Sequence, residues 1–389
     1  MVPLYVQQAA QDWQIKPLLE ARERFETRIE KDFDAGVPDR RSDQFTRLRP
    51  GLEVRYGKNW KAQLVYQYAH DWAWTPARNF STENSDVLYA NAQFENQDFK
   101  IVAGRQRIVL SSERLIGTGD WGNRGRSWDG IYASAKGWEV MASKIGVNAT
   151  RVRDARVAAL SKTWSGGQTM LIYKHDANPA GDDDLFTLDH VYRRTQGPWD
   201  FDAELALQGG HTKGLEQRAW AFHAGVGYKR PGSSTRFYAE VNAASGGTSG
   251  SVSHTFDQLF ASNHKLYGIM DVQGWRNMNS FSLSAEHKVN PKTTLLAGWH
   301  YFMLRDPADA WYSDGGAPNR WAGGVFQDPT GQSGRDIGHE LDLEVIYRPD
   351  ARWTLSAGVA AFLPGRYVES ITGSRTTQWW GYVQAVFKL

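Results

Sequence analysis

Apolar and polar residues alternate with a period of two along most of this chain. In the segment 44–57 the apolar side chains take even positions and the charged ones take odd positions: Leu48, Leu52, Val54 and Tyr56 against Arg47, Arg49, Glu53 and Arg55. Successive side chains of a β-strand point to opposite faces, whereas a helix with its period of 3.6 would scatter them around its axis. The pattern therefore predicts an all-β protein whose strands have one apolar face and one polar face.

The same alternation returns in the segments 19–29, 60–71, 199–208, 339–348 and 378–389, with Glu23 as an interruption of the first apolar face. A half-buried sheet of a soluble sandwich would alternate in the same way, and this is the alternative interpretation. Two features favour a closed transmembrane barrel. Many polar faces carry several charges in succession, as a water-filled lumen requires, and the chain ends directly on an alternating strand.

Composition agrees with a barrel in the outer membrane. The chain has 17 Trp and 16 Tyr, whose half-polar rings suit a membrane–water interface. No segment approaches the roughly 20 apolar residues of a membrane helix, and the absence of cysteine is compatible with passage through an oxidising periplasm. A formal net charge of +2 gives no bias toward nucleic acid. Residues 1–10 lack the apolar core of a signal peptide, so we expect the mature form of an exported chain.

Turn signals divide the sequence into about eighteen antiparallel strands of a single barrel domain, residues 1–389. The predicted strands are 13–30, 43–57, 59–73, 85–97, 99–110, 126–136, 137–147, 155–164, 167–178, 185–196, 197–212, 217–230, 234–244, 273–289, 292–305, 337–349, 351–363 and 376–389. Tight turns such as Lys136-Gly137 connect some of them, and the long connections are 31–42, 72–84, 111–125, 245–272 and 306–336. Short periplasmic turns and long extracellular loops are typical of outer-membrane barrels.

Several motif-like strings carry no chemistry in this setting. The segment 117–122 matches the G-x-G-x-x-G fingerprint, but that fingerprint works only between a strand and a helix. Asp182-Asp183-Asp184 is interpreted as an exposed acidic loop, with a calcium site as the alternative. The ten histidines show no metal-binding spacing. We therefore expect no metal and no cofactor.

Three blocks of sequence resemble the alginate-export family of outer-membrane proteins, whose fold is an 18-stranded barrel. They are Gly104-Arg105-Gln106 with Glu113-Arg114-Leu115-Ile116-Gly117, Asp120-Trp121-Gly122-Asn123 and Arg126-Ser127-Trp128-Asp129-Gly130; then 256–260, 264–268 and 271–277; then 338–343 and 362–365. Two positions depart from the family pattern. Ser112 stands where the family usually has an acidic residue, and Leu389 replaces the common terminal aromatic.

The resemblance implies a channel, and the chemistry of a channel lies in the charges that line it. An alginate-like polymer carries a carboxylate on every sugar, and guanidinium pairs with carboxylate while remaining charged at any relevant pH. The predicted path residues are Arg24, Arg47, Arg49, Arg105, Arg107, Arg126, Asp129 and Arg276, of which Arg49, Arg105, Arg126, Asp129 and Arg276 are the preferred constriction by resemblance. The alternative role for each is to brace the wall by pairing with a neighbouring strand.

We expect a channel that exports an anionic polysaccharide and is not an enzyme, with lipid and a periplasmic secretion partner around it. The alternatives are a porin for small anions such as uronates, nitrate or organic acids, and a barrel hydrolase with Ser and His on its wall. The resemblance makes the loops 245–272 and 306–336 candidate gates. Trp121, Trp128 and Trp275 are candidate stacking platforms for sugars, although an interface girdle or loop packing is the favoured interpretation for most of the 17 tryptophans. Replacing Arg105 and Arg126 with Glu is predicted to invert or abolish anion preference.

Overall fold

The fold is described from a computed structural model, in which residues 13–33, 39–75, 79–146, 155–177 and 181–389 are described. Within these residues, eighteen long strands form the wall of one antiparallel sheet that closes on itself. The wall strands are β1(Trp13–Ile29), β2(Arg40–Tyr56), β3(Trp60–Trp74), β4(Asn79–Glu95), β5(Phe99–Gln106), β6(Trp128–Ala135), β7(Trp138–Ile145), β8(Arg156–Trp164), β9(Gly167–Asp176), β10(Asp183–Gln196), β11(Trp199–Thr212), β12(Leu215–Tyr228), β13(Thr235–Ala244), β16(Met278–Asn290), β17(Thr293–Leu304), β20(Asp336–Tyr347), β21(Trp353–Pro364) and β22(Gln378–Lys388).

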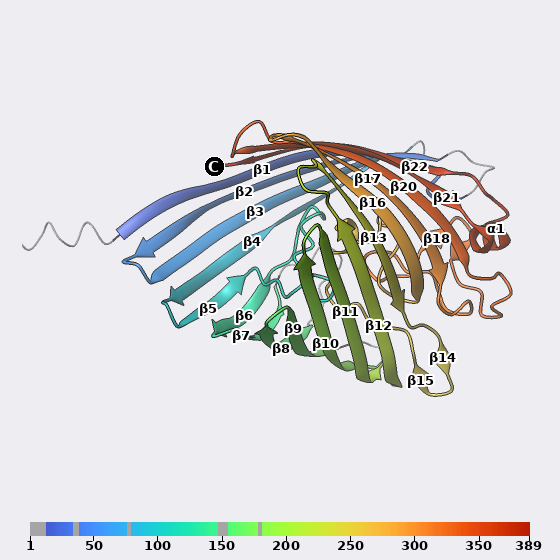
Figure 1. Cartoon of the computed structure of the whole chain (residues 1–389), viewed down its shortest axis with the longest axis horizontal. Coiled ribbons are helices and arrows are strands. Elements are labelled where there is room, and N and C mark those ends of the chain that lie inside the picture. The colour runs from blue at the N-terminus through green and yellow to red at the C-terminus, as the bar shows by residue number, and fades with distance from the viewer. Residues whose placement is uncertain (1–12, 34–38, 76–78, 147–154, 178–180) are drawn as a thin grey trace, which may run out of the picture.

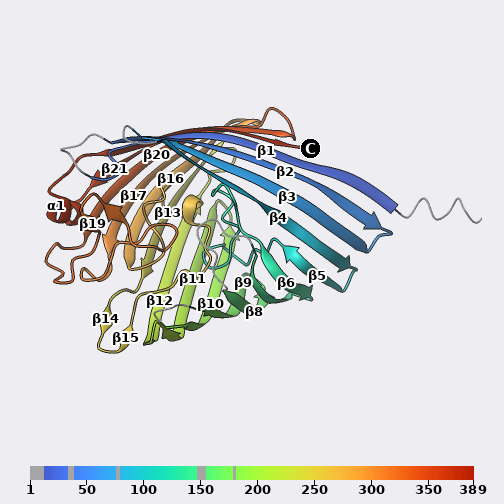
Figure 2. The same ribbon diagram turned by 180° about the vertical axis from the view of Figure 1, so that it is seen from behind.

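The first and last strands close the ring. β1 pairs with β2 on one side and with β22 on the other, in a register that runs from Glu20 opposite Lys388 to Ile29 opposite Trp379. Figures 1 and 2 show these two strands side by side from opposite viewpoints, with the start of β1 and the C-terminus at the same end of the molecule. A closed sheet leaves no unpaired edge, which is what a sheet needs to span a membrane. The predicted all-β barrel is confirmed.

The two faces of the wall follow the alternation in the sequence. Leu52 and Leu64 are 49% and 56% exposed on the outer face, whereas Glu53 and Gln67 on the lumen face are 7% and 2% exposed. Aromatic rings pair across neighbouring strands beside the short turns: Trp13 with Tyr56, Trp60 with Phe94, Trp199 with Tyr228, and Trp353 with Phe387. Such a girdle is typical of the boundary between lipid and water.

The connections differ between the two ends of the barrel. Short turns lie at the end that holds the start of β1, and the turn at Lys136-Gly137 has positive φ at both residues, as a two-residue hairpin requires. The long loops lie at the other end, where Figure 1 shows helix α1(Arg366–Thr372). These loops also contain the short pairs β14(Thr248–Ser249) with β15(Val252–Ser253) and β18(Arg320–Trp321) with β19(Gly324–Val325), together with the turn η2(Asn263–Lys265). No helix of the described residues is long and apolar enough to cross a membrane.

Most predicted strand bounds agree with the structure to within a few residues, but three segments differ. β4 begins at Asn79 and not at 85, because 79–84 continue the pairing with β3. β5 ends at Gln106 and not at 110, and β16 begins at Met278 and not at 273, because the chain leaves the wall there and turns inward. Helix α1 and the short pairs were not predicted. The signal-peptide expectation for 1–10, the strand ends at 147 and 178, and parts of the loops at 31–42 and 72–84 lie outside the described residues.

Three long connections fold into the barrel. We call them the first inner loop (107–127, between β5 and β6), the second inner loop (245–277, between β13 and β16) and the third inner loop (305–335, between β17 and β20). Backbone hydrogen bonds join the first to the second and the second to the third: the Gly117 N–H donates to the Phe260 carbonyl at 2.9 Å, and the Gly274 N–H to the Tyr312 carbonyl at 3.0 Å. Together they bury an apolar cluster that includes Ile116, Phe256, Phe260, Trp275, Trp311 and Phe326. The lumen is therefore partly filled and is not one open bore.

Candidate functional site

A cluster of arginines lies on the lumen face of β1 and β2. The antiparallel register places Arg22 opposite Arg47 and Glu20 opposite Arg49, and Arg24 follows two residues along β1. All four guanidinium side chains are buried, with residue exposures between 2% and 6%. Like charges opposite each other on a sheet destabilise it unless other groups compensate them. The partners of these arginines therefore decide what the cluster can do.

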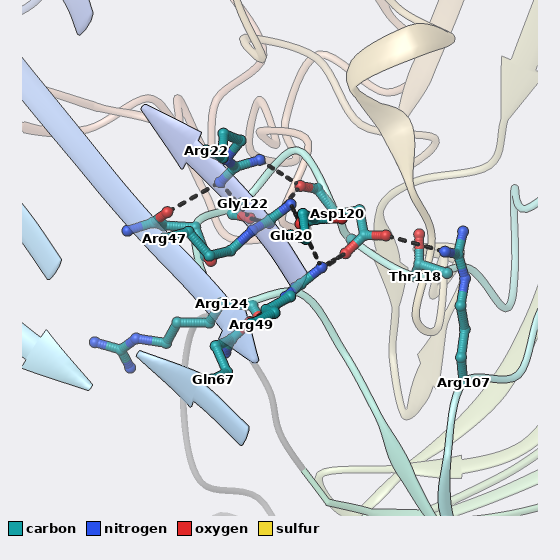
Figure 3. Close-up of polar contacts among 12 residues, drawn as sticks. Glu20, Arg22, Arg47, Arg49, Gln67, Arg107, Thr118, Asp120, Gly122 and Arg124 are labelled. Carbon is teal, nitrogen blue, oxygen red and sulfur yellow. Dashed lines mark hydrogen bonds and ion pairs between the residues drawn. The ribbon is translucent and has the colours of Figure 1, made fainter. Parts of the chain in front are cut away.

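The first inner loop supplies most of these partners. Arg22 donates to the backbone carbonyls of Asp120 at 2.8 Å, Trp121 at 3.2 Å and Gly122 at 3.2 Å, and to the side-chain oxygen of Asn123 at 3.0 Å. Figure 3 shows Arg22 and Arg47 on the wall reaching toward this stretch of the loop. Among the described residues, every hydrogen-bond acceptor of Arg22 is neutral. Arg22 is thus a buried cation that is solvated by carbonyl groups without a paired carboxylate.

Three carboxylates compensate the other arginines. Glu26 lies 2.8 Å from Arg24. Glu20 lies 2.6 Å from Arg47 and 3.2 Å from Arg49, and Asp120 of the loop lies 3.2 Å from both Arg49 and Arg107. Burial alone would raise the pKa of Asp120, but Arg49, Arg47 and Arg107 outweigh it and hold that pKa below its ordinary value. Asp120 therefore stays ionised and fixes the loop against the wall (Figure 3).

The local sequence of the loop allows this close approach. Gly125 has φ +67°, a left-handed conformation that glycine adopts without steric cost. A Cβ atom at this position would lie 2.8 Å from both the Arg49 guanidinium and the Asp120 carboxylate. The Asn123 side chain donates to the backbone carbonyls of Thr46 and His70 at 3.2 Å and so ties the loop to β2 and β3. A small residue and an amide are therefore needed where the loop meets the wall.

An aromatic stack connects the first and second inner loops. The Trp121 ring stacks on His264 at 3.6 Å with an interplanar angle of 6°, and the Arg24 guanidinium lies 3.8 Å from the centre of the Trp121 ring. Two lumen cavities, of about 690 and 630 Å³, both have Trp121 and His264 in their lining. The stack therefore lies at the boundary between two water-accessible spaces.

The second inner loop is fixed on two sides of the lumen. On one side, the Asp257 carboxylate lies 2.8 Å from the Lys174 ammonium group of β9. On the other side, Arg28 of β1 donates to the Met270 carbonyl, and the Met270 N–H donates to Glu340 of β20, each at 2.8 Å. The loop thus crosses the barrel from β9 to β1 and β20, which makes it a barrier inside the lumen.

Comparison with protein families decides the identity of this barrel. A family model described as alginate export matches residues 16–382, which is nearly the whole wall. The chain belongs to the alginate export family. No curated protein matches the sequence closely enough to count as a relative. Membership of the family confirms the resemblance seen in the sequence.

Solved structures give the same fold. The barrel is similar to three Pseudomonas aeruginosa proteins. OccK7 (OpdD) has a TM-score of 0.66 and 11% identity, and the match covers 97% of this chain and 99% of that chain. OpdK with vanillate has a TM-score of 0.61 and 12% identity, covering 97% and 98% of the two chains, and OprD has a TM-score of 0.58 and 11% identity, covering 96% and 93%. At such low identity these likenesses show the fold alone. Family and fold together make this protein an outer-membrane channel, with its short turns on the periplasmic side and its long loops on the extracellular side.

Two further predicted residues of this family member join the inner loops. Arg126 donates to the Gly117 carbonyl at 2.8 Å and to the carbonyls of Phe260 and Ala261. Burial lowers the pKa of Arg126 to about 10, so its guanidinium remains charged at neutral pH. Arg276 donates to the Gly316 carbonyl at 3.4 Å and so connects the second inner loop to the third. Both residues lie inside the barrel and are bonded to loop backbone.

The prediction that Arg105 and Asp129 line the lumen is wrong. Arg105 and Asp129 lie opposite each other on β5 and β6 and share a face with Ile101 and Ile131, which are 38% and 51% exposed on the outer side. The next residue along β5, Gln106, is 3% exposed and points inward. Because side chains alternate along a strand, Arg105 and Asp129 lie on the outer face.

Arg105 is therefore a brace of the wall. Its guanidinium lies 2.6 Å from Asp129 and 3.0 Å from Asp86, across three strands. Replacing Arg105 with Glu is expected to leave the zero-current potential in a salt gradient unchanged, because the charge lies outside the conducting path. Replacing Arg107 with Glu, inside the lumen, is expected to shift that potential toward cation preference. An equal shift in both variants would contradict the assignment of faces.

The two tryptophans predicted at 128 and 275 do not offer free faces. Each is 0% exposed, and they pack edge-on against Phe260 and Phe256. Of the three tryptophans considered in the sequence, Trp121 alone lines a lumen cavity. The expectation that Trp128 and Trp275 stack on sugars is corrected, because they belong to the buried core of the inner loops.

The two motif-like strings of the sequence, 117–122 and 182–184, lie in a loop and at the start of a wall strand. Residues 117–122 form part of the first inner loop, between two wall strands. Asp183 and Asp184 begin β10 and pair with Lys174 and His175 of β9 at 3.3 and 3.0 Å, so the interpretation of these two residues as an exposed acidic loop is wrong. Within the described part of the chain, no group of three or more His, Asp or Glu is arranged to hold a metal ion.

Sequence reasoning gave no role to Arg114, although it stands in the Glu-Arg-Leu block that identifies the family. Arg114 leaves the first inner loop toward the wall, where its guanidinium lies 3.6 Å from Glu240, 3.9 Å from Glu204 and 3.1 Å from the His223 ring. The charged pair Glu113 and Arg114 directly before the apolar pair Leu115 and Ile116 was the available signal. Arg114 fixes the first inner loop to β11–β13.

The pairing of Asp257 with Lys174 predicts a response to acid. Burial alone would raise the pKa of Asp257, but Lys174 and Arg276 outweigh it and lower that pKa to about 2. A carboxylate with a depressed pKa stabilises the folded arrangement above its ordinary pKa, and that contribution is lost as the pH falls through the depressed value. We expect the second inner loop to stay in place from pH 7 to about 4 and to loosen toward pH 2.

Single-channel conductance measures this loosening. Conductance is expected to rise as the pH falls below about 4, whereas Asp257→Asn is expected to conduct more at pH 7 already and to lose the acid response. Asp328→Asn, on an exposed turn of the third inner loop, serves as the control and is expected to behave as wild type. An acid response that persists in Asp257→Asn would assign it to another carboxylate.

Proposed function

We propose that this channel passes acidic saccharides of the alginate type across the outer membrane by way of the lumen arginines. The observation that carries the proposal is the cluster of Arg22, Arg24, Arg47 and Arg49 on the lumen face of β1 and β2. Guanidinium groups bind carboxylates in a forked geometry and remain charged when buried. Arg22 supports the proposal most strongly, because its neutral partners leave its charge available to an anion.

The inner loops give the arrangement a closed state. Loop carbonyls take the hydrogen-bond positions on Arg22, Arg24 and Arg47 that the carboxylates of a sugar acid would take. Movement of the first inner loop away from the wall would expose these guanidinium groups to the lumen. The sequence prediction of gates at 245–272 and 306–336 is retained as part of the proposal, and the first inner loop is added to them.

Planar bilayers test the function. The zero-current potential across a potassium chloride gradient is expected to show anion preference, and oligomannuronate is expected to block the current while uncharged dextran of equal length does not. Anion preference with no block by oligomannuronate would favour the second candidate. Cation preference would contradict both candidates.

The second candidate is a porin for small carboxylates. Two observations favour it: cavities of about 690 and 630 Å³ beside the stack of Trp121 and His264 suit a small ligand better than a polymer, and OpdK, which has been solved with vanillate, shares the fold. Block by vanillate together with indifference to oligomannuronate would select this candidate.

A further inference from the structure

A third cavity lies between the arginine cluster and the periplasmic mouth. It has a volume of about 420 Å³ and is lined by β3, β4, β5 and β6 and by the start of the first inner loop. Its cationic lining residues are Lys61, Lys100 and Arg107. Lys61 follows the short turn at 57–59, and Lys100 follows the short turn at 96–98, which places the cavity close to the periplasmic end.

The charge of this cavity differs from that of the two larger ones. Carboxylates such as Asp120 and Glu240 line the larger cavities, whereas the residues that line this one include lysine, arginine, amides and tyrosine but no Asp or Glu. Among the described residues, neither the Lys61 nor the Lys100 ammonium group takes part in a hydrogen bond or an ion pair. The two ammonium groups are thus available to an anion in the lumen.

Two carboxylates beside these lysines are already engaged by other groups. Glu53 interacts with Lys61 only through long-range electrostatics. Its close partners are Arg55, at 2.6 Å, and Gln63, which donates a hydrogen bond at 2.7 Å. Glu95, opposite Lys100 in the register, accepts a hydrogen bond from Gln93 at 2.7 Å. Arg55 and the two glutamines therefore hold these carboxylates, and neither carboxylate forms an ion pair with Lys61 or Lys100.

The neutral lining suits the rest of a sugar acid. The register sets Gln63 opposite Asn91 and Lys61 opposite Gln93, so amide groups and the two lysines share one patch of lumen face. Amides and the Tyr89 phenol both donate and accept hydrogen bonds, as sugar hydroxyls require. Arg107, which also pairs with Asp120 at 3.2 Å, lines this cavity and the cavity of about 690 Å³, so it connects the patch to the arginine cluster.

We propose that Lys61, Lys100 and Arg107 form a periplasmic-mouth site that binds the carboxylate of an acidic sugar before it reaches the arginine cluster. The site deepens the proposed function and rests on it. Lysine is a strongly hydrated point charge and holds carboxylate less firmly than a guanidinium fork does. A site of this kind concentrates a polyanion at the mouth and releases it toward the arginines.

Block by oligomannuronate, added to one side of the bilayer at a time, tests the site. In Lys61→Gln/Lys100→Gln, the concentration for half-block from the periplasmic side is expected to rise roughly tenfold, with little change from the extracellular side. The matched control is Lys58→Gln/Lys292→Gln, which removes two charges from turns at the same rim, outside the cavity. Circular dichroism confirms that each variant keeps its barrel.

The outcomes separate the site from the function. If oligomannuronate blocks the wild type and blocks Lys61→Gln/Lys100→Gln equally well, the periplasmic-mouth site is wrong and the proposed function stands. An equal loss in the control variant would also overturn the site, because rim charge alone would then explain the effect. If oligomannuronate fails to block the wild type from either side, the polysaccharide function fails and the site fails with it.

Discussion

Replacing Arg114 with Ala is expected to release the first inner loop and to raise single-channel conductance several-fold. Arg114 is the cation that compensates Glu204 and Glu240 inside the barrel, and all three side chains are buried. Removing one partner of a buried charged group leaves the others without compensation, at a cost of about 3–5 kcal/mol. We expect this loss to destabilise the closed arrangement of the loops and not the wall, because the wall has its own continuous ladder of backbone hydrogen bonds.

Two variants show whether this effect belongs to the buried charge. Arg114→Lys retains the charge and is expected to keep most of the wild-type conductance. Arg218→Ala breaks an exposed pair with Glu216 on the wall and is expected to change nothing. If Arg114→Ala kept its barrel, as judged by circular dichroism, and conducted like the wild type, Arg114 would not be what holds the loop.

The wall of this barrel could be predicted because its physics is local. Each strand carries its own period-two signal, and tight turns such as Lys136-Gly137 mark where one strand ends and the next begins. β1 was predicted at 13–30 and found at Trp13–Ile29, and β13 was predicted at 234–244 and found at Thr235–Ala244. A strand facing lipid on one side and polar groups on the other has to show this pattern whatever the rest of the chain does.

The face of an individual side chain was harder to predict near strand ends. Arg105 and Arg107 have the same phase in the sequence, so alternation alone assigns both to one face. The strand ends at Gln106, however, and the chain then turns inward. Arg105 consequently lies on the outer wall and Arg107 in the lumen. Because a shift of one residue moves a side chain to the opposite face, the strand end had to be known to one residue.

The contents of the lumen were beyond sequence reasoning for a different reason. Phe256 was expected in a loop and Trp275 in the strand 273–289, yet they pack together inside the barrel. The same holds for the polar contacts of the site. Arg22 on β1 donates hydrogen bonds to carbonyls of a loop about one hundred residues away in the sequence. Backbone carbonyls carry no sequence signal, so a loop that binds arginines through its backbone cannot be distinguished from any other loop.

Replacing both Arg22 and Arg47 with Gln is expected to reduce the preference for anions over cations roughly tenfold. The two guanidinium groups lie opposite each other on the lumen face, and Arg22 has only neutral partners among the described residues. Their removal leaves Glu20 and Asp120 balanced by Arg49 and Arg107, so the excess of positive charge at this level of the lumen is lost. The zero-current potential in a salt gradient measures the change.

The control removes two arginines from the outer face, in Arg40→Gln/Arg105→Gln, and is expected to keep the wild-type potential. Because Arg22 and Arg47 also hold the first inner loop, conductance in the Arg22→Gln/Arg47→Gln variant is expected to rise while selectivity falls. That combination separates two roles of the cluster. A rise in conductance with unchanged selectivity would show that the arginines serve only to anchor the loop, and the anion path would then have to be sought elsewhere on the wall.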